Sequence, residues 1–87
     1  MNVNKKFPFE IELVGRRIRQ LRLKNQMTQS HLATMCDVDI RTIQRIEKGQ
    51  QNISLTLLLS LIAALGIHVN DLLGDLSDGI KKTKLES

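Results

Sequence analysis

The sequence predicts an all-α fold, in which five helices form one compact bundle. In the first third of the chain, apolar residues recur every three to four positions, as on the buried face of a helix, and no segment alternates apolar and polar residues as a strand would. The apolar residues are mostly Leu, Ile and Val, with Phe7 and Phe9 as the only aromatic residues, which favours an aliphatic helical core. Because 87 residues bury only a small core, a single domain is expected.

The first helix is predicted over residues 10–25, after an arm of residues 1–9 that Phe7-Pro8-Phe9 is expected to pin to the domain. Pro8 disfavours a helical backbone at Phe7, so the helix is expected to begin beyond it. Four apolar residues at spacings of three, four and three positions form its buried stripe: Ile11, Val14, Ile18 and Leu21.

The next two helices are marked by N-capping residues, whose side chains bond the free N–H groups of a first helical turn. Thr28 caps a helix that runs to about Cys36, and Asp39 caps a helix over residues 40–48. Gly49 follows at the position where a left-handed backbone ends a helix.

The last two helices are bounded in the same way. Ser54 caps a helix over residues 55–65, and Gly66 closes it. This helix is apolar nearly all round, so we expect it at the centre of the bundle, surrounded on most sides. A short helix over residues 69–73 follows. The chain thus divides into an N-terminal arm of residues 1–9, a helical domain of residues 10–74 and a polar flexible tail of residues 75–87.

Positive charge gathers in the first half of the chain. Residues 1–49 carry ten Lys and Arg against five Asp and Glu, whereas residues 50–80 carry no basic residue and three acidic ones. A phosphate-rich partner suits this distribution, because neutralised phosphates release their counterions. A basic face that is merely solvated explains the charge equally well.

Several classes of protein are not expected. No apolar run approaches the roughly 20 residues that span a bilayer, and the first residues lack the apolar stretch of a secretory signal, so we predict a cytoplasmic, nucleoid-associated protein with no membrane partner. The sequence shows no glycine-rich phosphate loop, no paired carboxylates and no nucleophile–base arrangement, so neither an enzyme nor a cofactor is expected. Cys36 is the only cysteine, which excludes an internal disulfide, and with the two histidines it forms no zinc-ligand pattern. We interpret Cys36 as a core residue, His31 as a solvated residue and His68 as a turn residue.

Residues 28–49 carry the functional signal. They are expected to form two short helices joined by a tight turn, and the second helix carries long polar side chains where the major groove of DNA can meet them. No other segment resembles a site for chemistry. This segment therefore predicts a DNA-binding protein, against the alternative of a small helical domain without that role.

Short motifs spread over residues 11–74 strengthen this interpretation. They are Ile18-Arg19-Gln20-Leu21-Arg22, Thr28-Gln29, Leu32-Ala33, Val38, Thr42-Ile43, Ile46-Glu47-Lys48-Gly49, Ser54-Leu55, Ala64-Leu65-Gly66-Ile67 and Asp71-Leu72-Leu73. With these motifs in this order and spacing, the chain resembles the lambda-repressor-like, XRE-type helix-turn-helix family of bacterial and phage regulators. The resemblance implies a lambda-repressor-like bundle and double-stranded DNA as the partner.

The resemblance also implies which residues contact DNA. The third helix corresponds to the family's recognition helix, whose exposed positions read base edges: Ile40, Arg41, Thr42, Gln44 and Arg45. Arginine can grip guanine with two hydrogen bonds, glutamine can pair with adenine, and isoleucine can pack on a thymine methyl group. Contacts to DNA phosphates are expected from six residues: Arg19, Thr28, Gln29, Gln50, Gln51 and Asn52. Gln29 begins the second helix, where free N–H groups attract an anion.

Three further features follow from the resemblance. Arg22 and Glu47 match a pair that forms a partly buried salt bridge in the family, a role that ranks above DNA contact for Arg22. Asp37 stands where the family usually has Gly, so the turn before the recognition helix is expected to be slightly altered or strained. Ile53 stands where many relatives have Pro.

The apolar residues around the fourth helix exceed what one small core needs. They either pack deeply or form a homodimer seam, for which we predict Leu55, Leu59, Ile67, Val69 and Leu73. A symmetric dimer presents two recognition helices one DNA turn, ~34 Å, apart.

The predicted function is therefore that of a sequence-specific, homodimeric transcriptional regulator, a repressor on an inverted-repeat operator. Two alternatives stay open: an antitoxin that binds a toxin protein and represses its own operon, and a restriction–modification controller. The neighbouring genes distinguish them.

Overall fold

A computed structural model describes residues 6–74 and residue 76. These residues form five α-helices and no strand: α1 (Pro8–Lys24), α2 (Gln29–Met35), α3 (Ile40–Glu47), α4 (Leu55–Leu65) and α5 (Val69–Leu73). The all-α, five-helix prediction is confirmed.

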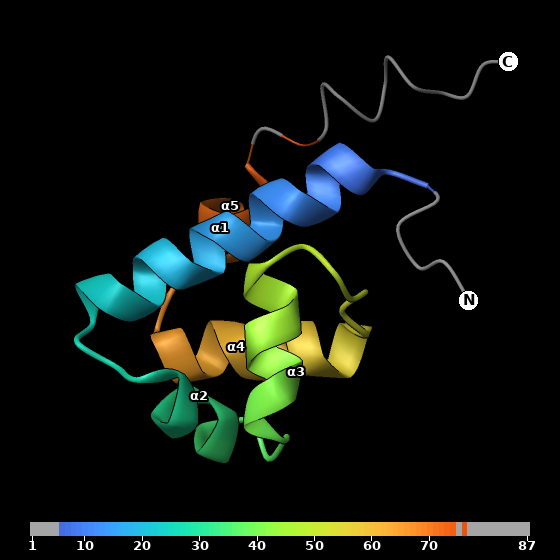
Figure 1. Ribbon diagram of the computed structural model, residues 1–87. Helices are drawn as coiled ribbons and strands as arrows, with labels where there is room; N and C mark the ends of the chain where they lie inside the picture. Colours follow the sequence, from blue (N-terminus) through green and yellow to red (C-terminus); the bar gives the residue numbers. More distant parts are fainter. Residues whose placement is uncertain (1–5, 75, 77–87) are drawn as a thin grey trace, which may run out of the picture.

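The helices enclose one core to which every helix contributes. Helix α3 packs against both α1 and α2, while α5 lies along α1 and α4 contacts α2 (Figure 1). The guanidinium of Arg17 in α1 donates to the carbonyl oxygen of Leu72 in α5 at 2.8 Å, which ties these two helices together. The fully buried side chains are Ile18, Leu32, Ile43, Ile46, Leu61 and Leu72.

The predicted caps set the helix starts. At α2, the Thr28 hydroxyl accepts a hydrogen bond from the backbone N–H of His31 at 2.9 Å. At α3, the Asp39 carboxylate accepts one from the backbone N–H of Arg41 at 2.8 Å. At α4, the Ser54 hydroxyl accepts one from the backbone N–H of Leu57 at 3.1 Å. Each side chain satisfies an N–H group that its helix leaves unpaired. The predicted starts of α2, α3 and α4 are therefore confirmed.

Glycine ends two helices as expected. Gly49 and Gly66 adopt positive φ angles of 71° and 64°. This left-handed conformation is easily reached only without a Cβ atom.

The two ends of the domain lie further out than predicted. Helix α1 begins at Pro8 rather than at residue 10, because proline fits the first helical turn, where no N–H partner is needed. Phe9 therefore belongs to α1, and its ring is 65% exposed instead of pinning the arm to the domain. Leu76, which falls within the predicted polar tail, is buried in the core. The rest of the predicted arm and tail, residues 1–5, 75 and 77–87, lies outside the described residues.

Helix α4 is not surrounded on most sides, and this prediction was wrong. Its inner face buries Leu61 and Leu65, but Leu55 is 70% exposed and Leu59 is 57% exposed on the opposite face. Composition alone cannot show that the other four helices are too short and too few to cover both faces. One chain thus leaves an apolar strip of α4 in contact with water.

A glycine inside α1 permits a close approach to α3. Gly15 is buried, and a Cβ atom at this position would overlap the backbone carbonyl oxygen of Ile46 in α3. The backbones of α1 and α3 therefore touch directly at this position.

We expect Gly15→Ala to destabilise the domain by about 2–3 kcal/mol, because the added methyl group must displace backbone rather than a flexible side chain. In an open helix the same change would stabilise by roughly 0.5–1 kcal/mol. Urea unfolding measures the difference. Gly66→Ala is the matched control: a Cβ there meets open space, so only the left-handed backbone costs about 1 kcal/mol. A Gly15→Ala variant as stable as the wild type would contradict the assigned contact.

Candidate nucleic-acid interface

Helices α2 and α3 present one solvent-facing surface because their inner faces are buried. Leu32 and Ala33 of α2 pack into the core with Ile43 and Ile46 of α3. The turn between the helices passes through Asp37, whose φ of 57° is left-handed. Aspartate thus adopts here the conformation for which glycine is better suited.

Cys36, at the end of α2, is a core residue, as interpreted from the sequence. Its side chain is buried, and burial raises the pKa of the thiol because desolvation disfavours the thiolate. The reactive form is therefore suppressed at neutral pH.

A row of positive charge runs along the exposed face of α3 and includes the residue directly after it. Arg41 and Arg45 are exposed, as is Lys48 directly after the helix, and the spacing of four and three positions places all three on one face. Within residues 6–74 and 76, no acidic side chain forms an ion pair with them. Like charges at this spacing repel each other, so this row favours a polyanion. Ile40, at the start of the helix, is 38% exposed.

Lys48 was not among the residues predicted to contact DNA. Its signal was present in the sequence as the third basic residue of the series that begins with Arg41 and Arg45. Its place at the predicted end of the helix favoured a structural role.

The other two predicted base-reading residues lie on opposite flanks of this row. Gln44 is half-buried and lines a polar cleft of about 450 Å³, together with Arg19, Gln29, Glu47 and Lys48. Thr42 is half-buried on the other flank, in a groove that it shares with Gln51 and Ser54. Of the five predicted base-reading residues, Ile40, Arg41 and Arg45 therefore lie on the exposed face, and Thr42 and Gln44 lie on its two flanks.

The predicted phosphate-contacting residues are likewise divided. Arg19 of α1 and Gln29 of α2 meet in the polar cleft, and Thr28 and Gln50 are exposed. Gln51 lines the groove on the Thr42 side.

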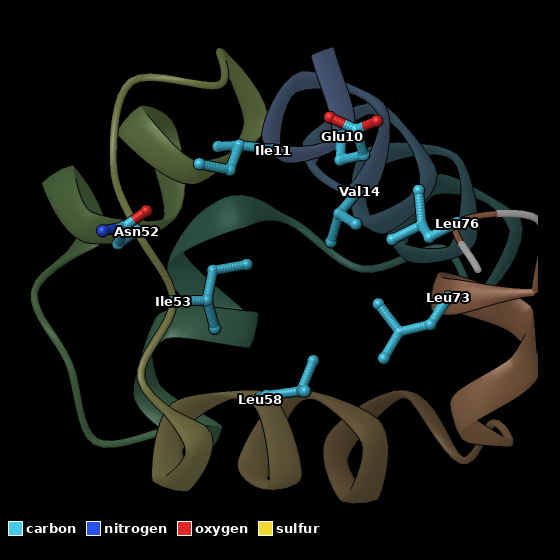
Figure 2. Close-up of a pocket in the computed structure, with 8 residues that line it drawn as sticks. All are labelled: Glu10, Ile11, Val14, Asn52, Ile53, Leu58, Leu73 and Leu76. Atoms are coloured by element: carbon cyan, nitrogen blue, oxygen red, sulfur yellow. The ribbon is translucent and has the colours of Figure 1, made fainter. Parts of the chain in front are cut away.

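Asn52 lies elsewhere, with Glu10 at an apolar pocket of about 190 Å³ (Figure 2). The side chains of Leu58, Leu73 and Leu76 point into this pocket. Among the predicted dimer residues, Leu73 is therefore directed inward. Leu55, Leu59 and Val69 are exposed, and Ile67 is half-buried.

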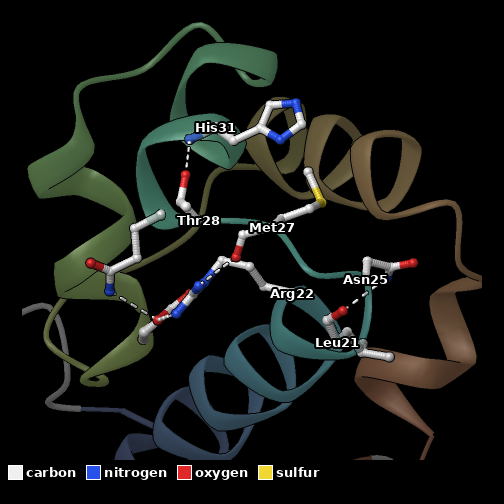
Figure 3. Close-up of polar contacts among 8 residues, drawn as sticks. Leu21, Arg22, Asn25, Met27, Thr28 and His31 are labelled. Carbon is white, nitrogen blue, oxygen red and sulfur yellow. Dashed lines mark hydrogen bonds and ion pairs between the residues drawn. The ribbon is translucent and has the colours of Figure 1, made fainter.

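Arg22 and Glu47 form a buried ion pair next to the polar cleft, which Glu47 lines. Arg22 Nε donates to Glu47 Oε2 at 2.7 Å and Arg22 Nη2 to Glu47 Oε1 at 3.0 Å, with side-chain exposures of only 8% and 3%. Arg22 Nη1 also donates to the carbonyl oxygen of Met27 at 2.8 Å (Figure 3). One guanidinium thus joins α1, the turn before α2, and the end of α3.

Gln29 makes a contact that the sequence did not predict. Its Nε2 donates to Glu47 Oε1 at 3.1 Å, so a residue expected to face phosphate is also bonded to the ion pair. Glu47 accepts three hydrogen bonds in all.

We expect Arg22→Met to destabilise the domain by about 3–5 kcal/mol, because it leaves the Glu47 carboxylate buried without a cation. Thermal or urea unfolding measures this loss. The R22M/E47M double variant is the control: with both charges removed and the volume roughly kept, most of the stability is expected to return. If the double variant were as unstable as Arg22→Met, the loss of stability could not be due to the unpaired buried carboxylate of Glu47.

Comparison with known proteins identifies the family. The helix-turn-helix family matches residues 18–72. The chain is 42% identical over 62 residues to the control protein C.BamHI of Bacillus amyloliquefaciens, covering 70% of this chain and 76% of that protein.

Two solved structures share the fold at clear sequence identity. The restriction–modification controller protein C.AhdI from Aeromonas hydrophila superposes with a TM-score of 0.71 at 33% identity, covering 74% of this chain and 97% of that one. The clp gene regulator ClgR from Corynebacterium glutamicum gives a TM-score of 0.73 at 28% identity, covering 80% and 74%.

No helix in the described part of the chain combines the length and apolar character needed to cross a membrane. Nor do residues 6–74 and 76 contain a group of His, Cys, Asp and Glu side chains that could hold a metal ion. The helix-turn-helix geometry, the basic outer face of α3 and these matches lead to one conclusion: the chain belongs to the XRE-type helix-turn-helix family of DNA-binding transcriptional regulators.

Proposed function

We propose that the protein is a homodimeric regulator that reads an inverted-repeat operator with the exposed face of α3. The observation that carries the proposal is the row of Arg41, Arg45 and Lys48, three cations that have no acidic partner among the described residues. In the major groove, such a row meets guanine edges and the adjacent phosphates.

The position of each side chain suggests its role. Arg41 and Arg45, on the exposed face, are proposed to read guanine, and Ile40 to pack on a thymine methyl group. Gln44 and Thr42 lie on the two flanks and would reach only bases at the edges of the half-site.

Phosphate contacts are proposed on both sides of the groove. Arg19, Gln29 and Lys48 share the polar cleft, where the N-terminus of α2 adds partial positive charge. On this proposal the remaining contacts come from Thr28, Gln50 and Gln51. Asn52 is left out because it lies at the apolar pocket, away from both the polar cleft and the groove.

A second copy of the chain is the proposed occupant of the exposed apolar strip on α4 and α5. Leu55, Leu59 and Val69 are large, exposed and apolar, and half-buried Ile67 lies between the two helices in the sequence. A patch of this kind is typical of a protein–protein interface. Two-fold symmetry would then set two α3 helices about one DNA turn apart, ~34 Å.

The biological role we propose is control of a restriction–modification operon. C.BamHI and C.AhdI are controller proteins, and C.AhdI is described as a restriction–modification controller. None of the relatives named above is described as an antitoxin, so no observation favours that alternative. Restriction and methyltransferase genes beside this one would support the proposal, and a toxin gene would argue for the antitoxin.

Separate substitutions should distinguish base reading from phosphate contact. We expect Arg45→Ala to weaken binding to the operator by about 1–3 kcal/mol and to relax preference at one base position, whereas Lys48→Ala weakens all sequences similarly and lowers the salt slope by about one. Fluorescence anisotropy over a salt series, with operator and scrambled fragments, measures both. Arg45→Lys is the matched control, because it keeps the charge but loses the two-pronged geometry. Equal loss on operator and scrambled DNA for Arg45→Ala would reject base reading.

A charge in the exposed strip should separate the protomers. Leu59→Asp is expected to shift the dimer to monomer in sedimentation, because a carboxylate at the centre of an apolar interface is desolvated without a partner. Leu23→Asp is the control, since Leu23 is 49% exposed but lies on α1, outside the strip. Both variants should keep the wild-type helical content. Dissociation by Leu23→Asp rather than Leu59→Asp would place the interface elsewhere.

A further inference from the structure

Glu47 joins two parts of the site that the proposed function treats separately. Its Oε1 atom accepts from Arg22 Nη2 at 3.0 Å and from Gln29 Nε2 at 3.1 Å. Its Oε2 atom is occupied by Arg22 Nε at 2.7 Å. The same carboxylate therefore belongs to the buried ion pair and touches the first residue of α2.

This contact fixes which end of the Gln29 carboxamide faces the cleft. A carboxylate only accepts hydrogen bonds, so the amide nitrogen must face Glu47, and the amide oxygen must point elsewhere. Because Glu47 lines the cleft with Gln29, the nitrogen lies on the cleft side. An Nε2 group has two hydrogens, and Glu47 uses one of them.

The remaining hydrogen has the chemistry that a phosphate oxygen needs. If the amide turned over, it would present its oxygen to the phosphate and repel it. A glutamine without a fixed partner must also lose side-chain freedom when it binds, which weakens affinity. A glutamine held in place by Glu47 has lost that freedom already in the folded protein.

Arg22 makes this arrangement compatible with DNA. Glu47 alone would place a negative charge at the bottom of a phosphate-binding cleft, but the guanidinium neutralises it with two hydrogen bonds. Arg19 and Lys48, which also line the cleft, then leave it with net positive charge.

We infer that Glu47 is a positioning residue for DNA binding: it orients the Gln29 carboxamide so that a free Nε2–H meets one backbone phosphate in the cleft. This inference rests on the proposed function. Glu47 then has a role beyond the stability of the ion pair, and the contact between Gln29 and the phosphate depends on Glu47.

A double-mutant cycle on operator affinity tests this dependence. The four proteins are the wild type, Gln29→Ala, R22M/E47M, and the triple variant, each checked for folding by urea unfolding. Gln29→Ala should weaken binding about tenfold in the wild type, as expected for losing one hydrogen bond to a charged group. In the R22M/E47M background it should cost less than about twofold, because Gln29 is no longer held. An equal cost in both backgrounds would overturn the inference.

The R22M/E47Q variant serves as the conservative rescue, because it leaves no buried arginine without a carboxylate. Its amide oxygen can still accept from Gln29 at the position of Oε1, so the full cost of Gln29→Ala should reappear in this background. A purely structural role for Glu47 would give no such pattern, because stability would change without any change in the coupling. Absence of the rescue would count against the positioning role.

A second measurement on the wild-type chain needs no variant. When the operator is added, NMR should show one Gln29 Nε2 proton shifting strongly while the proton bonded to Glu47 stays in place. If neither shifts although DNA binds, the inference fails and the proposed function stands. If the wild-type chain binds no DNA fragment, the proposed function fails, and the inference with it.

Discussion

The ion pair between Arg22 and Glu47 connects three segments that are distant in the sequence. The guanidinium holds the end of α1, the carbonyl oxygen of Met27 before α2, and the carboxylate at the end of α3. Both side chains are nearly inaccessible to water, so each charge depends on the other. The domain therefore uses a buried polar contact where the end of α1 meets the turn before α2 and the end of α3.

Features that depend on local sequence could be predicted well. The caps at Thr28, Asp39 and Ser54 follow from side-chain chemistry within three residues, and the left-handed turns at Gly49 and Gly66 from the missing Cβ atom. Such interactions involve only residues that are neighbours in the sequence, so no knowledge of packing is needed to place them.

Features that depend on assembly could not be predicted in the same way. In the sequence, Gly15 only lowers the helix propensity of α1, and its role in the contact with Ile46 of α3 is visible only in the folded structure. The sequence of α4 does not show which of its apolar faces is covered. The hydrogen bond from Gln29 to Glu47 joins residues 18 positions apart, and no periodicity reports such a pair. At the candidate site, the resemblance indicated α3, but only the rotation of this helix in the bundle separates exposed Arg41 and Arg45 from the flanking Thr42 and Gln44.

The exposed row on α3 also has a consequence for how such a protein can diversify. Arg41 and Arg45 belong neither to the core nor to the ion pair, although they lie in the same helix as buried Ile43, Ile46 and Glu47. One helix thus combines a constrained half and an unconstrained half, divided along its length. On the proposed function, single substitutions on the outer half would change operator preference and leave the interior untouched. Base recognition and folding would then depend on different faces of the same helix.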